Sequence, residues 1–159
     1  ACVAASPLER CRQTAELLYP GQAPCVFDQF REMDFGAFEG HNCEELKADV
    51  RYQAWIDSNG TLPFPQGESR EQFQRRCVEG FCKLLKEVWT RERSLSSFAL
   101  VVHGGTIMAL LEAFAEGSYY DYQCANAKGY KGRLSVEFDV AGNVLRDTIK
   151  IADVRKLEE

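Results

Sequence analysis

The run Phe98-Ala99-Leu100-Val101-Val102, followed at once by His103-Gly104-Gly105, decides the fold class of this chain. Five consecutive apolar residues are typical of a strand that is buried on both faces of a sheet. Residues 106–114 continue with an apolar pattern that predicts a helix. A buried strand that leads directly into a helix is the repeating unit of parallel α/β sheets.

The rest of the chain repeats this alternation of strand and helix. The expected elements are, in chain order, a strand at 1–5, a helix at 7–19, a strand at 25–27, a loop at 31–40, a helix at 43–58, a loop at 59–67, a helix at 69–93, and a hairpin of strands at 134–139 and 144–151. Asn42 is expected to cap one helix, and Ser69 opens another with a capping box. The order predicts a single α/β domain over residues 1–159 with a mostly parallel sheet.

The charge and hydropathy of the chain exclude two classes of partner. The net charge is -5, so the chain lacks the basic field that holds nucleic acid. No apolar run approaches the ~20 residues of a membrane-spanning helix, so no membrane partner is expected. An acidic chain also repels phosphorylated molecules at long range, and any phosphate site must therefore be built from local cations.

The cysteine pattern favours a reducing compartment. There are seven cysteines, no CxxC pair, and no metal-like spacing between a cysteine and either histidine. We therefore expect neither a disulfide framework nor a metal site, and we expect a cytoplasmic protein whose cysteines pack as small apolar residues.

The first candidate site segment is SPLERCRQTA at residues 6–15, where a strand passes into a helix. Ligands of open α/β sheets bind at the carboxyl ends of the strands, and helix starts favour anions. A guanidinium at Arg10 or Arg12 could fork onto two phosphate oxygens. On composition alone, the interpretation of both arginines as ordinary surface residues is favoured.

The second candidate is Glu32, in a loop that follows the strand at 25–27. A carboxyl group flanked by aromatic residues can be partly desolvated, which raises its pKa and suits it to donate a proton to a leaving alkoxide. Asp34 and Glu39 in the same loop are competitors that spacing does not exclude, and a solvated carboxylate is the alternative for all three.

The third candidate is His103, which ends the buried strand. This position directs a side chain to the ligand-binding end of the sheet, and the glycines after it let a ligand approach the backbone. The alternative is a histidine that is hydrogen-bonded inside the core. We interpret the only other histidine, His41, as a surface residue beside the helix cap.

Taken in order, these segments resemble the histidine phosphatase superfamily, also called phosphoglycerate-mutase-like, and its phosphatase branch in particular, which includes broad-specificity and α-ribazole phosphatases. Four motifs carry the likeness between residues 6 and 106: SPLERCRQTA, the Glu32 segment, PQGES at residues 65–69, and VVHGG at residues 101–105. The resemblance implies that Glu32 and His103 are catalytic and that Arg10, Ser6 and Gly104 bind the phosphoryl group. It implies no metal and no other cofactor.

The chain departs from the family at one essential point. The nucleophilic histidine of the family lies in an Arg-His-Gly motif at the end of its first strand, and no Arg-His-Gly occurs in this sequence. We therefore expect an N-terminally truncated, three-layer α/β/α domain that lacks its first strand and is inactive alone.

For the complete protein, the resemblance implies hydrolysis of a small phosphorylated metabolite through a phosphohistidine intermediate. Two alternatives stay open. A mutase of the phosphoglycerate mutase type would return the phosphoryl group to its substrate. A non-catalytic module would keep the phosphate pocket without turnover. The sequence identifies neither the phosphoester nor the oligomeric state.

Overall fold

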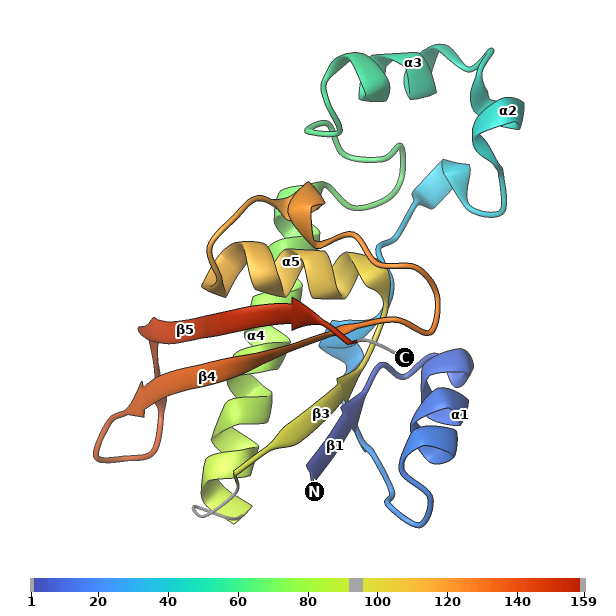
Figure 1. Ribbon diagram of the computed structural model, residues 1–159. Helices are drawn as coiled ribbons and strands as arrows, with labels where there is room; N and C mark the ends of the chain where they lie inside the picture. Colours follow the sequence, from blue (N-terminus) through green and yellow to red (C-terminus); the bar gives the residue numbers. More distant parts are fainter. Residues whose placement is uncertain (1, 92–95, 158–159) are drawn as a thin grey trace. The chain divides into compact units, whose positions relative to one another are not determined.

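A computed structural model describes residues 2–91 and 96–157 of the chain (Figure 1). The chain divides into two compact units, one of Ala1–Glu32 with Arg76–Glu159 and the other of Met33–Arg75. Among the described residues, no helix is long and apolar enough to cross a membrane.

The first unit contains the predicted parallel sheet. Strands β1 (Cys2–Ala5), β2 (Cys25–Val26) and β3 (Phe98–Val101) lie in the order β2-β1-β3, and β1 runs parallel to both neighbours. Val3 is opposite Ala99 and Ala5 is opposite Val101. Segments that are distant in the sequence therefore lie side by side in one parallel sheet, which confirms the α/β class.

Helices cover both faces of this sheet. Side chains alternate along a strand, and the face with Val3 and Ala5 packs against Ala15 of helix α1 (Glu9–Leu18). The opposite face carries Phe98, whose ring lies 6.2 Å from that of Phe81 on α4 (Arg70–Arg91). Figure 1 shows α1 and α4 on opposite sides of β1 and β3. The layers are therefore helix, sheet and helix, as expected.

Helix α4 approaches the segment before Glu32 so closely that only glycine fits at one position. The 3-10 helix η1 (Asp28–Phe30) packs on Gly80, where a Cβ atom would lie 2.6 Å from Gln29 Cβ and 3.0 Å from Phe30 Cε1. Phe30 is fully buried there. This contact fixes the segment that leads into Glu32.

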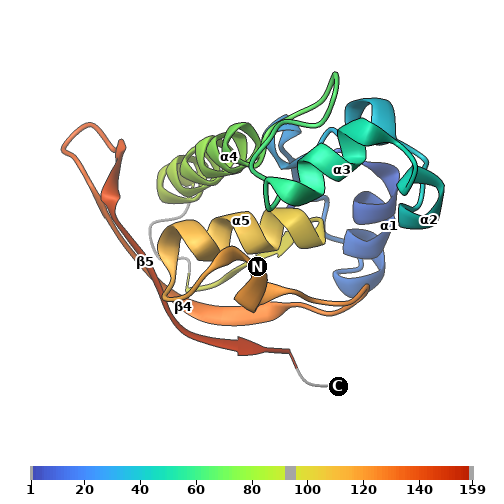
Figure 2. The same ribbon diagram turned by 90° about the horizontal axis from the view of Figure 1, so that it is seen from above.

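The predicted hairpin is present and longer than expected. Strands β4 (Tyr130–Phe138) and β5 (Val144–Lys156) pair antiparallel, with two register shifts. The Asp139 carboxylate accepts hydrogen bonds from the backbone of Ala141 and Asn143 in the turn. Figure 2 shows the hairpin curving along α5 (Gly104–Phe114), which β5 contacts. The short 3-10 helix η3 (Tyr119–Tyr122) connects α5 to the hairpin.

In the second unit, one predicted helix proves to be two. The expected helix at 43–58 divides into α2 (Cys43–Leu46) and α3 (Val50–Asp57). The predicted cap at Asn42 is confirmed, because its side chain accepts from the Glu45 backbone at 3.0 Å. The division follows from Asp49, whose carboxylate accepts from the Arg51 backbone at 2.8 Å and starts a second helix.

The rest of the second unit is a small aromatic core. The Trp55 ring stacks on Phe64 at 4.9 Å, and Phe38 meets Phe64 edge to face at 5.9 Å. The loop predicted at 31–40 contains a 3-10 turn, η2 (Gly36–Phe38). The predicted capping box at Ser69 is present, with Ser69 and Gln72 bonded reciprocally at 2.8 and 3.1 Å.

Candidate functional site

Four of the five predicted site residues form one cluster at the carboxyl ends of β1 and β3. Ser6 follows β1 directly, and His103 is the N-cap residue of α5. Arg10 lies in the first turn of α1, and Glu32 follows η1. Parallel strands end at one edge of a sheet, so the loops after them bring these side chains together. Gly104, the fifth, is the first residue of α5.

His103 is held from one side by Ser6. Its Nε2 lies 2.7 Å from Ser6 Oγ. Ser6 is completely buried, and the His103 side chain is 3% exposed. The Leu8 N–H also donates to Ser6 Oγ, at 3.3 Å. The histidine ring is therefore fixed by the residue that follows β1 as well as by its own helix.

The other ring nitrogen of His103 faces two charged groups. Arg10 Nη2 lies 3.0 Å from Nδ1, and Glu32 Oε2 lies 3.4 Å from it. Arg10 Nη2 and Glu32 Oε2 are 3.7 Å apart. The arginine side chain is 62% exposed and the glutamate 28%, so both remain open to a ligand. A cation, a carboxylate and an imidazole thus converge on one point at the surface.

The two carboxylates that competed with Glu32 have other roles in the second unit. Asp34 Oδ1 accepts from the Gly36 backbone at 2.8 Å, and Glu39 Oε1 accepts from the Phe35 backbone at 3.1 Å. Both stabilise turns of their own loop. Glu32, in the first unit, lies within 4 Å of both Arg10 and His103.

Sequence reasoning missed Arg76. From α4, its guanidinium donates to the carbonyl oxygens of Gln29 at 2.8 Å, Arg31 at 3.0 Å and Glu32 at 3.3 Å. These bonds hold the backbone that presents the Glu32 carboxylate. Nothing in the spacing of Arg76 within a long amphipathic helix distinguishes it from a surface arginine.

Cys11 is a second residue that sequence reasoning did not place at the site. Its Sγ lies 3.7 Å from Nε2 and 3.8 Å from Nδ1 of His103. Burial raises the pKa of this thiol, so it is a neutral neighbour of the ring. The sequence interpretation, a small apolar residue in the core, agrees with its burial but not with its polar contact.

His103 is uncharged at neutral pH. Burial, together with the positive charges of Arg10 and Arg76, lowers its pKa from 6.5 to about 4. A neutral imidazole has one donor and one acceptor nitrogen, so one of the partners Ser6 and Arg10 faces a donor and the other faces an acceptor.

The cluster is suited to an anionic oxygen group. Arg10 supplies a partly exposed guanidinium, and the N-terminus of the 11-residue helix α5 supplies backbone N–H groups beside His103. A Cβ atom at Gly104 would meet only Cys124 O, at 3.9 Å, so the space beside this helix start is open. Within residues 2–91 and 96–157, no group of three histidine, cysteine or acidic side chains is arranged to hold a metal ion.

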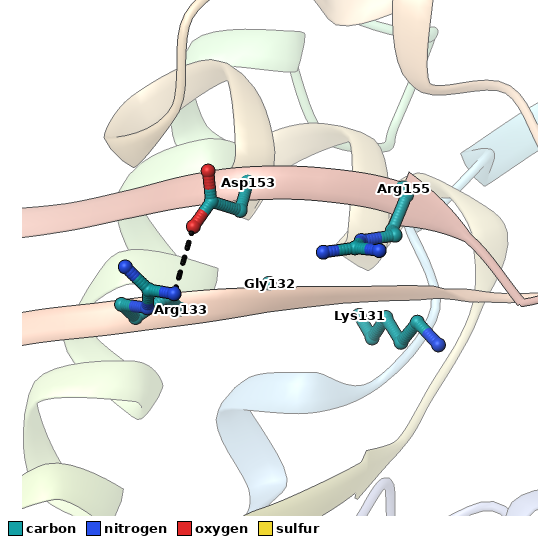
Figure 3. Close-up of a pocket in the computed structure, with 5 residues that line it drawn as sticks. All are labelled: Lys131, Gly132, Arg133, Asp153 and Arg155. Atoms are coloured by element: carbon teal, nitrogen blue, oxygen red, sulfur yellow. Dashed lines mark ion pairs between the residues drawn. The ribbon is translucent and has the colours of Figure 1, made fainter.

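A separate hollow of about 290 Å³ lies on the β4–β5 hairpin and contains no predicted site residue (Figure 3). It is lined by Lys131, Gly132, Arg133, Asp153 and Arg155. Arg133 and Asp153 form an ion pair at 3.3 Å, but their side chains are 81% and 51% exposed. This hollow is shallow and highly solvated compared with the buried contacts of His103.

Three of the solved structures that resemble this chain are named as two phosphatases and a mutase. A mycobacterial glucosyl-3-phosphoglycerate phosphatase has 23% identity and a TM-score of 0.69, over 98% of this chain and 75% of that one. A putative α-ribazole-5'-P phosphatase from Escherichia coli has 18% identity and a TM-score of 0.64, over 95% and 71%. A phosphoglycerate mutase from Thermus thermophilus has 28% identity and a TM-score of 0.55, over 91% and 70%.

A search of curated proteins gave no match. The model of one protein family, described as histidine phosphatase superfamily (branch 1), matches residues 1–146. That range includes β1, β3, the four clustered site residues and most of the hairpin. The match confirms the resemblance carried by the sequence motifs. The chain belongs to branch 1 of the histidine phosphatase superfamily.

Proposed function

We propose that the complete protein hydrolyses a small phosphomonoester through a phosphohistidine intermediate, and that this chain carries its phosphate-binding and proton-transfer residues. The observation that supports this most is the convergence of Arg10 and Glu32 on His103 Nδ1, within 3.0 and 3.4 Å. Two structural relatives that are named as phosphatases agree with it.

In the first step, a nucleophilic histidine nitrogen attacks phosphorus as the bond from phosphorus to the ester oxygen breaks. Glu32 gives its proton to the leaving alkoxide. In the second step, water attacks phosphorus, Glu32 takes a proton from that water, and the phosphorus–nitrogen bond breaks to release phosphate. Arg10 and His103 stabilise the charge on the phosphoryl oxygens in both steps.

Neither histidine of this chain suits the role of nucleophile. The His103 side chain is 3% exposed, its Nε2 is bonded to buried Ser6, and its Nδ1 lies between Arg10 and Glu32. His41 is exposed in the second unit, 3.4 Å from Glu45. We therefore place the nucleophile on a further strand, beside β3. Among the described residues, β3 pairs only with β1, and its apolar residues stay half-buried.

We place this activity in the cytoplasm. All seven cysteines are free, including exposed Cys43. Unpaired thiols persist in reducing compartments and tend to pair in oxidising ones.

Hydrolysis of p-nitrophenyl phosphate without added metal tests the proposal. The chain would be assayed alone and with an N-terminal strand carrying Arg-His-Gly. We expect turnover only with the strand, and a loss of about 10²-fold or more in Glu32→Gln. Glu39→Gln is the matched control, because its carboxylate serves a turn of the second unit.

Three other outcomes would contradict the proposal in different ways. Equal loss in the Glu32→Gln and Glu39→Gln variants would exclude Glu32 as the specific proton donor. Phosphate binding without turnover by the extended protein would indicate a non-catalytic binding module. Stimulation by a bisphosphorylated cofactor, with transfer back to substrate, would indicate a mutase.

A further inference from the structure

The contacts of His103 assign its single proton to one ring nitrogen. A guanidinium has donors and no acceptor, and Arg10 Nη2 lies 3.0 Å from Nδ1. Nδ1 must therefore accept this hydrogen bond and carry no proton. The proton of the neutral ring then lies on Nε2, which is 2.7 Å from Ser6 Oγ.

Ser6 Oγ is placed to accept a hydrogen bond from this N–H and is not free to move away. Its N–H donates to the Val101 carbonyl at 3.1 Å, which continues the β1–β3 pairing by one residue. Its side chain is completely buried and also accepts from the Leu8 N–H. Both the backbone and the hydroxyl of Ser6 are thus fixed by the sheet and by the start of α1.

We propose that Ser6 is a positioning residue that holds His103 by its Nε2–H and thereby makes Nδ1 the nitrogen that faces the substrate. The identity of that substrate as a phosphoryl group rests on the proposed function. Ser6 does not contact the substrate in this assignment, which replaces the direct phosphate-binding role implied by the family resemblance. Its complete burial supports this change.

The same geometry couples anion binding to a proton. An anion that takes up the Arg10 guanidinium removes the donor from Nδ1, and this nitrogen then accepts one proton from solvent. Glu32 Oε2, 3.4 Å away, accepts the new N–H. The charged groups around the ring are Arg10 and Arg76, which oppose protonation, and Glu32, which favours it. The Cys11 thiol is neutral. A bound anion thus weakens the Arg10 contact and adds its own negative charge beside the ring, and both changes shift the balance toward imidazolium.

Nitrogen-15 NMR of the imidazole rings at pH 7 tests the assignment on the chain as it is. His41 is an exposed internal reference, and His41→Gln identifies its signals. We expect His103 to show an unprotonated Nδ1 and a protonated Nε2. The opposite tautomer, or an imidazolium in the free chain, would overturn the proposal.

Variants of Ser6 separate positioning from packing. We expect Ser6→Ala, which removes the partner of Nε2, to let the ring turn about its Cβ–Cγ bond and present either nitrogen to Arg10. The result is a mixture of the two His103 tautomers, while Ser6→Thr keeps the wild-type tautomer. Ser97→Ala removes an exposed serine hydroxyl and is the matched control. An unchanged tautomer in folded Ser6→Ala would overturn the role of Ser6. If Ser6→Ala does not fold, a changed tautomer in folded Ser6→Thr would overturn it instead.

Inorganic phosphate, titrated to tens of millimolar, tests the coupling. We expect His103 Nδ1 to become protonated as phosphate binds. Phosphate binding with a ring that stays neutral would overturn the coupling. The absence of any phosphate-dependent change near Arg10 would count against the proposed function, whereas the tautomer of the free chain decides the role of Ser6 independently.

Discussion

Arg10 and His103, 93 residues apart in the sequence, meet through a nitrogen–nitrogen contact of 3.0 Å. A permanent cation at the acceptor nitrogen of an imidazole disfavours a second positive charge on that ring. With burial as the larger cause, this contact keeps the pKa of His103 low and the ring neutral. The positive charge nearest the open side of the site is therefore that of Arg10, and the ring itself stays neutral until an anion arrives.

The first prediction concerns the replacement of this cation. Arg10→Gln removes the charge that helps to lower the pKa of His103, so we expect that pKa to rise from about 4 toward its ordinary value of 6.5. Burial is the larger cause and stays in place, so the rise should be partial. The pKa is measured by NMR titration of the His103 ring protons. Arg12→Gln, an exposed neighbour in the same helix, should leave it unchanged.

The second prediction is a loss of stability in acid. The unfolded chain binds a proton at His103 near pH 6.5 and the folded chain only near pH 4, so the unfolded state holds more protons between these values. The free energy of unfolding should therefore fall as the pH drops through this window. The part due to His103 is on the order of 3 kcal/mol at pH 4.

Urea unfolding at several pH values measures this loss. His103→Gln should remove the corresponding part of the slope, and His41→Gln, at an exposed position, should keep it. Equal slopes in the wild type and His103→Gln would show that the folded and unfolded states bind this proton alike.

The sequence was sufficient to predict that Ser6 and His103 lie together, because both follow strands. Ser6 comes directly after β1 and His103 two residues after the end of β3, and parallel strands align their carboxyl ends. An apolar run followed by polar residues is visible without a structure. The same reasoning could not choose among Glu32, Asp34 and Glu39, since that choice depends on the path of a loop that turns through two short 3-10 helices.

Two other features lay beyond the sequence for physical reasons. Arg76 bonds to backbone carbonyl groups, and a carbonyl has no signature in the amino-acid sequence. The break between α2 and α3 depends on whether Asp49 caps a helix or lies within one, and both arrangements suit the apolar spacing of Leu46, Val50 and Ala54.

The third prediction follows from Arg76. Arg76→Ala leaves the carbonyl groups of Gln29, Arg31 and Glu32 without their guanidinium donor. We expect a loss of about 1–3 kcal/mol in the free energy of unfolding, and faster amide hydrogen exchange at residues 29–32. Arg75→Ala, an exposed arginine one position earlier, is the control. Unchanged exchange at residues 29–32 would mean that Arg76 does not hold the Glu32 backbone.

The fourth prediction reverses a usual effect of helix propensity. Glycine in a helix interior costs about 0.5–1 kcal/mol relative to alanine, so Gly80→Ala in α4 would ordinarily stabilise the protein. Here the added Cβ would lie 2.6 Å from Gln29 Cβ and 3.0 Å from Phe30 Cε1. We expect destabilisation of about 1–3 kcal/mol by thermal or urea unfolding. Glu79→Ala, exposed on the same helix, controls for propensity, and a stabilised Gly80→Ala would refute the close contact.

The fifth prediction concerns the thiol beside the His103 ring. Cys11 is buried and burial raises its pKa, so little thiolate forms and access is blocked. Cys43 is exposed at the start of α2. With limiting iodoacetamide at pH 8, mass spectrometry of the digested protein should find Cys43 alkylated well before Cys11, and urea should abolish the difference. Phosphate should not accelerate labelling of Cys11, because the ring that covers it is held by Ser6 and not by Arg10 alone. Early labelling of Cys11 in the folded chain would show that His103 and Ser6 separate in solution, and it would contradict the fixed ring on which the assignment of Nδ1 depends.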